Sequence, residues 1–84
     1  MEMQKTTAPI FQLLSESMPK PIIDKVSDSL IYEGHAPLGT HEEAEGWMIA
    51  RITISGTVTK TEYAQGTMDF VSAWSAREDY QYSR

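Results

Sequence analysis

Alternation of apolar and polar residues is clearest between residues 47 and 63. Each half of this stretch is rich in β-branched and aromatic residues, which favour pleated, half-buried surfaces. Two alternating sets occupy its first half: Met48, Ala50, Ile52 and Ile54, and Trp47, Ile49, Arg51 and Thr53. A period of two sends these sets to opposite faces of a strand. Ser55 and Gly56 can supply the positive φ of a tight turn, so the stretch predicts a β-hairpin.

A weaker alternation precedes the hairpin. Residues 22–33 predict a strand that is imperfect, which indicates either an edge strand or a bend near Asp28 and Ser29. Residues 34–39 contain two glycines and a proline and predict a loop.

Two short helical segments are also expected. Thr40 and Glu43 have the spacing of a capping box, which would begin a helical turn that ends at Gly46. Asp69 could cap a short helix that places Phe70 and Trp74 on one face. Residues 80–82 then predict a closing strand.

The N-terminal residues have a different pattern. Residues 1–23 contain the helix breakers Pro9, Pro19 and Pro21, with a short apolar stripe between them. Ile10, Phe11, Leu13 and Leu14 form this stripe. Two interpretations remain: an arm that orders on a partner, or a short helix that covers the domain's own core.

Together these elements predict an α+β, mainly β fold. Short connections exclude parallel crossovers, so we expect a small antiparallel sheet of about four strands, with one or two short helices and an N-terminal arm. The predicted division is an arm or short helix over residues 1–23 and an antiparallel β domain over residues 24–84.

Composition narrows the function classes. The chain has 84 residues, no cysteine and a net charge of −5, so we expect one small domain without disulfides or thiolate metal sites. Residues 24–45 hold six acids and one base, and no basic footprint for nucleic acid is present. No apolar run approaches the ~20 residues that span a bilayer, and no secretory signal is expected.

Candidate chemistry is sparse. His35, His41, Glu42, Glu43 and Glu45 form the one metal-like cluster, but their spacing matches no known zinc motif. No serine lies in a GxSxG or SxxK motif. We therefore expect no cofactor, no metal and no enzymatic activity.

Aromatic residues are the other candidate group. Trp47, Tyr63, Trp74, Tyr80 and Tyr82 could stack sugars or bases, but packing in a core or at an interface is the favoured interpretation. Arg51 and Arg77 lie near aromatic residues in the sequence and could position Trp74 or bind acids at an interface.

The order of motifs over residues 26–83 resembles a family of small virion structural proteins of tailed bacteriophages. The resemblance lies in a Tyr-x-Gly-x-Ala loop, a Trp-x-Ile-x-Arg-Ile strand, a Glu-Tyr-Ala-x-Gly turn and a Phe-x-x-x-Trp segment. These motifs begin here at Tyr32, Trp47, Glu62 and Phe70, and Arg77 and a Tyr-rich strand at residues 80–82 follow them. Gln65 stands where an acid is usual, and residues 42–45 are unusually acidic.

The resemblance implies a non-enzymatic component of a virion, assembled in the host cytoplasm. It would decorate the capsid or belong to the head–tail or tail apparatus, and would contact copies of itself and other virion proteins. The alternative is a binding module that recognises a host protein or a surface glycan through exposed aromatic residues. The expected interface residues are Ile10, Phe11, Leu14, Trp47, Tyr63, Trp74, Tyr80 and Tyr82.

Overall fold

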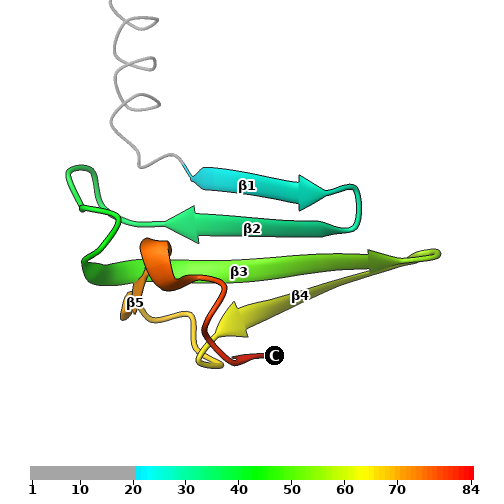
Figure 1. The fold of residues 1–84 in the computed structure, drawn as a ribbon. Coiled ribbons are helices and arrows are strands. Elements are labelled where there is room, and N and C mark those ends of the chain that lie inside the picture. The colour runs from blue at the N-terminus through cyan, green and yellow to red at the C-terminus, as the bar shows by residue number, and fades with distance from the viewer. Residues whose placement is uncertain (1–20) are drawn as a thin grey trace, which may run out of the picture.

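A computed structural model describes residues 21–84, which form a mainly β domain (Figure 1). Its elements are β1 (Ile22–Ser27), β2 (Leu30–His35), β3 (Glu45–Ser55), β4 (Val58–Ala64), β5 (Ser72–Ala73), a 3₁₀ helix η1 (Trp74–Ala76) and β6 (Tyr82–Ser83). All pairings are antiparallel, in the order β1-β2-β3-β4-β6, and β5 pairs with the first residues of β3. The expected antiparallel, mainly β architecture is confirmed, with six strands in place of about four.

The predicted arm or helix lies mostly outside the described residues, and so do Ile10, Phe11 and Leu14. The described part of the chain enters β1 at Ile22, inside the segment that the sequence assigned to the arm. Because Ile22 pairs with Gly34, this first residue already belongs to the sheet.

The predicted hairpin is confirmed as β3 and β4. Ser55 pairs with Val58, so Gly56 and Thr57 form a two-residue loop, and Gly56 has the expected positive φ of 61°. The stretch at residues 22–33 is divided into two strands by a turn at Asp28 and Ser29. The Ser29 amide donates a hydrogen bond to Ser27 Oγ, which supports a turn that contains neither glycine nor proline.

The predicted helical turn after Thr40 is wrong. The Thr40 hydroxyl donates backward to the carbonyl of Pro37, at 2.7 Å, instead of capping a following helix. Residues 41–44 form a single turn, closed by the Ala44 amide and the His41 carbonyl, and β3 begins at Glu45. The Thr40 hydroxyl is used in this local hydrogen bond and does not cap a helix, so no helix follows it.

The predicted helix from Asp69 to Trp74 is also wrong. Its first residues make an exposed bend, its middle is strand β5, and η1 begins only at Trp74. η1 is the single helical element that residues 21–84 contain. Pairing of Ser72 with Trp47 fixes this segment in an extended conformation, which overrides the i, i+4 spacing of Phe70 and Trp74.

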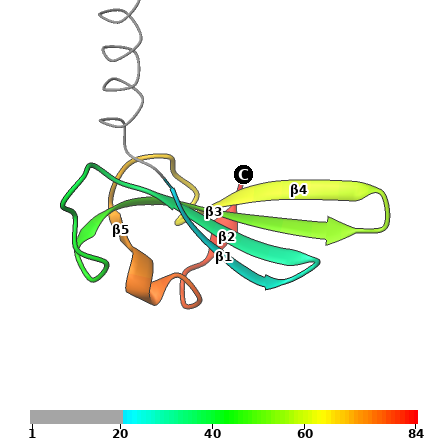
Figure 2. The same cartoon turned by 90° about the horizontal axis from the view of Figure 1, so that it is seen from above.

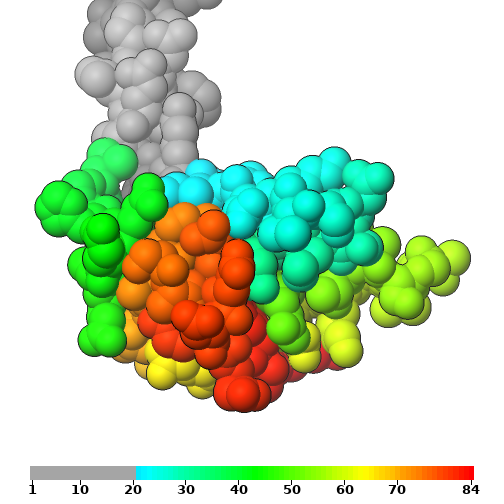
Figure 3. All heavy atoms as spheres, in the orientation of Figure 1, coloured from blue at the N-terminus to red at the C-terminus, as the bar shows by residue number. Residues whose placement is uncertain are grey.

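The core lies on one face of the sheet only. Its buried side chains are Tyr32, Ala36, Trp47, Ile49, Ala64 and Trp74, with Ile22, Leu30, Tyr80 and Tyr82 packed against them. In Figure 3, residues 72–84, drawn orange to red, occupy the centre of this covered face. Figure 2 shows η1 on one side of β3 and the segment that joins β4 to β5 on the other. The sheet is therefore covered unequally.

Neighbouring isoleucines of β3 test this asymmetry. Ile49 is 0% exposed on the covered face, whereas Ile52 points to the opposite face and is only partly buried. We expect Ile49→Ala to lower the free energy of unfolding by about 2–5 kcal/mol and Ile52→Ala by less than about 2 kcal/mol. Urea unfolding of the two variants measures the difference, and equal losses would contradict a one-faced core.

Candidate interaction surface

The covered face is built on a close approach of Trp74 to Gly34. A Cβ atom on Gly34 would lie 2.5 Å from Trp74 Cε3 and 3.2 Å from Trp47 Cε3, so only glycine fits between the two indoles and the sheet. The indole rings are 6.0 Å apart between centroids, and Trp47 Nε1 donates to the His41 carbonyl at 2.9 Å. Trp47 and Trp74 are therefore both packed against Gly34 of β2.

Arg77 stabilises the packing of Trp74 against the sheet. Its guanidinium lies 4.5 Å from the Trp74 ring centroid and donates two hydrogen bonds to Asp24 Oδ2, at 3.2 and 2.9 Å. It also donates to the Trp74 carbonyl, at 3.1 Å. One side chain therefore joins the edge strand β1 to the C-terminal segment. The predicted role of Arg77 in positioning Trp74 is confirmed.

Arg51 makes a second connection of the same kind. Its guanidinium lies 4.7 Å from the Tyr82 ring centroid and donates to Glu62 Oε1 at 2.9 Å. This hydrogen bond holds the pKa of the Glu62 carboxyl below its ordinary value. The Tyr82 ring also packs on Tyr32, with 5.9 Å between centroids. The Arg51 side chain therefore contacts the C-terminal segment that covers this face and is already paired with an acid of its own domain.

The tyrosines of the C-terminal segment are bonded internally. The Tyr82 hydroxyl donates to the Arg77 carbonyl at 2.7 Å, and the Tyr80 hydroxyl accepts from the Ala73 amide at 2.8 Å. With Trp47 and Trp74 buried, four of the expected interface aromatics pack in the domain's own core. Tyr63 differs, because it pairs with Ala50 on the opposite face and is partly exposed there.

Replacing Gly34 tests the close approach. We expect Gly34→Ala to cost at least about 1–3 kcal/mol and to change the tryptophan fluorescence, because the new methyl group must displace an indole. Gly46→Ala is the matched control, since its Cβ would meet only the Thr40 methyl, at 3.3 Å. A Gly34→Ala protein as stable as the Gly46→Ala protein would contradict this packing.

Burial of Tyr82 predicts a dependence of stability on pH. Desolvation, and to a smaller extent Tyr32, raises the pKa of the Tyr82 phenol well above its ordinary value of about 10. Above pH 10 the unfolded chain releases this proton and the folded chain retains it. The free energy of unfolding therefore falls as the pH rises, by up to about 1.4 kcal/mol per pH unit for this group.

The variant Tyr82→Phe isolates this contribution. At pH 7 it should be about 1 kcal/mol less stable, because the hydrogen bond to the Arg77 carbonyl is lost. The difference from the unmodified chain should shrink as the pH rises from 9 to 11. Chemical denaturation over this range measures it, and a constant difference would contradict the burial of the phenol.

The opposite face of the sheet, here called the open face, is apolar but has no comparable layer over it. Strand register places on it Ile23, Ile31, Met48, Ala50, Ile52, Ile54 and Tyr63, with Lys25, Glu33, His35, Thr59 and Thr61 among them. Ile23 is 60% exposed, and most of the other apolar side chains are partly exposed. None of these residues belongs to the core cluster.

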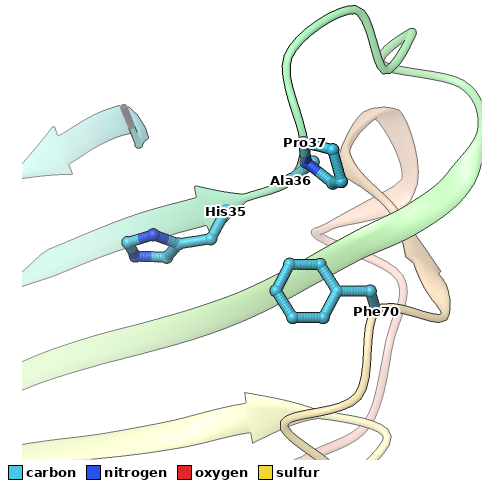
Figure 4. A pocket seen from close by; sticks show the side chains of 4 residues that line it. All are labelled: His35, Ala36, Pro37 and Phe70. Atoms are coloured by element: carbon cyan, nitrogen blue, oxygen red, sulfur yellow. The ribbon is translucent and has the colours of Figure 1, made fainter. Parts of the chain in front are cut away.

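A shallow hollow lies at one end of the open face (Figure 4). It is lined by His35, Ala36, Pro37 and Phe70 and has a volume of about 300 Å³. The ring of Phe70 points back over the sheet toward His35, and this side chain is 52% exposed. His35 Nε2 lies 2.8 Å from Glu33 Oε2, which directs the imidazole along the sheet. The hollow is mostly apolar and holds no converging set of charges.

The candidate metal ligands are not brought together. In the part of the chain that the structure describes, no three His, Asp or Glu side chains are placed to hold an ion. His41 lies in the loop and its carbonyl accepts a hydrogen bond from Trp47, while His35 is hydrogen-bonded to Glu33 on β2.

Among residues 21–84, no helix is long and apolar enough to cross a membrane.

Sequence reasoning missed two important residues of this architecture. Gly34 was assigned to a loop, and Asp24 was counted only as part of an acidic stretch. Glycine inside an otherwise β-rich run signals a close approach. No signal in the sequence joins Asp24 to an arginine 53 residues away.

Comparison with known proteins gives no match: no family model, no curated protein and no solved structure is similar to the chain. The open face and its hollow are therefore interpreted from their own geometry and from the sequence motifs.

Proposed function

We propose that this protein is a non-enzymatic structural component of a tailed-phage virion that acts through protein–protein contacts. The observation that carries the proposal is the open face, an apolar sheet surface that lies outside the core cluster and that, among residues 21–84, only the segment between β4 and β5 borders at one end. The assignment to a virion follows from the motif order, which resembles that of phage virion proteins. Partners would be copies of the chain and other virion proteins, at the capsid or the tail apparatus.

Unequal coverage supports association over catalysis. The open face has one exposed isoleucine, Ile23, and several partly exposed apolar side chains, and apolar surface in contact with water favours association. Substrates need a concave site with convergent polar groups, whereas the hollow beside Phe70 is lined by one imidazole and apolar side chains. A second surface would stabilise the open face by excluding water from it.

The edge of the sheet supports the same conclusion. β1 pairs with β2 on one side only, so the outward backbone groups of Ile22–Ser27 have no strand partner among the described residues. This edge has no proline, and its inward charge, Asp24, is neutralised by Arg77. The register shifts between Lys25 and Ser27, so the regular part of the edge that could accept another strand is residues 22–25.

The alternative, a module that binds a host protein or glycan through exposed aromatics, has less support, because both tryptophans expected at its site are buried. Trp47 is 5% exposed and Trp74 is 3% exposed, so neither indole offers a face for stacking. Tyr80 and Tyr82 use their hydroxyls within the domain.

Quantitative mass spectrometry of purified particles tests the proposal. The chain should be present at a fixed copy number, and Ile52→Asp should lower that number by about tenfold or more, because it places a charge on the buried contact. Thr57→Asp, at the exposed hairpin turn, is the matched control and should assemble normally. Circular dichroism would establish that both variants fold.

Absence of the unmodified chain from washed particles would contradict the proposed function. Equal incorporation of the Ile52→Asp and Thr57→Asp proteins would instead show that the open face is not the contact.

A further inference from the structure

We propose that the apolar segment at residues 10–14 of one copy docks on the open face of a neighbouring copy, at the hollow beside Phe70. The inference rests on the proposed function and names the occupant of the open face. Three observations carry it: where the hollow lies, where the described chain begins, and what the preceding residues contain.

The hollow adjoins the point at which the N-terminal segment leaves the sheet. Ile22 pairs with Gly34, so Pro21 is one step beyond that pair, level with His35. His35, Ala36 and Pro37 line the hollow. The end of the open face that is hollowed is therefore the end at which the described chain begins.

Residues 10–14 have the composition that this site requires. Ile10, Phe11, Leu13 and Leu14 place four apolar side chains within five positions. The hollow is apolar and can receive one such side chain, while the exposed isoleucine Ile23 continues the apolar surface along β1. Burying a Phe or Leu side chain stabilises a contact by about 1.5–3 kcal/mol. The segment and the face thus supply complementary surfaces.

The link between the apolar segment and β1 is long enough to reach a neighbouring copy. Eight residue steps separate Leu14 from Ile22 and can span about 26 Å at about 3.3 Å per residue. The proposed function, which requires contacts between copies, favours a neighbouring copy over the chain's own sheet.

Engineered disulfides test the exchange, because the chain has no cysteine of its own. One copy carries Gln12→Cys, within the docking segment, and an isotopically labelled copy carries Pro37→Cys, at the exposed rim of the hollow. The matched control is Ser75→Cys, an exposed position on η1, at the covered face. The full-length proteins are mixed, oxidised and analysed by mass spectrometry.

The Gln12→Cys and Pro37→Cys copies should form a mixed disulfide in about tenfold higher yield than the pair with Ser75→Cys, since docking raises the local thiol concentration. Adding Phe11→Asp and Leu14→Asp to the first copy should abolish the difference. Equal yields for the two pairs would overturn the proposal. An intrachain bond in a chain that carries both Gln12→Cys and Pro37→Cys, without mixed disulfide, would also overturn it and place the segment on its own sheet.

The two proposals fail separately. If the chain is found in purified particles but gives no preferred mixed disulfide, the exchange is wrong and the virion role stands. If the mixed disulfide forms but the chain is absent from particles, the exchange describes an oligomer with another role.

Discussion

Contact between the Trp74 indole and the glycine at position 34 is the constraint on which this structure depends. The sheet approaches the indole so closely that no larger residue fits at that position. Because Trp74 is the first residue of η1, its position against Gly34 determines where the last eleven residues cross the sheet. Arg77 then stacks on the same ring and bonds Asp24, which joins the beginning of the domain to its end. In a short chain without disulfides, these contacts fix the C-terminal segment against the sheet.

The same constraint leaves the second face open. The described chain covers one face with η1 and the C-terminal segment, whereas on the other face only the segment between β4 and β5 lies at one end of the sheet. Small domains bury a limited fraction of their surface, and an antiparallel sheet commonly leaves one face to water. Here that face is unusually apolar, with isoleucines at neighbouring positions of β2 and β3. The proposed cover for this face is another molecule.

Local signals predicted those elements that local chemistry determines. The β3–β4 hairpin followed from strict alternation and from Gly56, whose positive φ the turn requires. The two helices failed for the opposite reason. Thr40 and Asp69 have the spacing of helix caps, but the Thr40 hydroxyl is used by Pro37 and the residues after Asp69 are drawn into pairing with β3. A local hydrogen bond decided the first segment and tertiary pairing decided the second, and periodicity over four residues could not anticipate either.

The covered face and the open face differ in the same way. Alternation along β3 separated the two sets of side chains correctly, but nothing in the strand itself shows which set Trp74 covers. The aromatic residues expected at an interface are mostly in the core, because the C-terminal segment folds back over them. The isoleucines of the other set lie on the open face, which is the contact surface that we propose.

Hydroxyl-radical footprinting of the full-length protein, dilute and in assembled particles, tests the central claim most directly. Met48 and Tyr63 lie on the open face, whereas Trp47 and Trp74 are buried on the covered face. We expect Met48 and Tyr63 to be oxidised in the dilute protein and protected after assembly, with both tryptophans protected throughout. Reactive tryptophans in the dilute protein, or Met48 and Tyr63 equally reactive in both states, would contradict it.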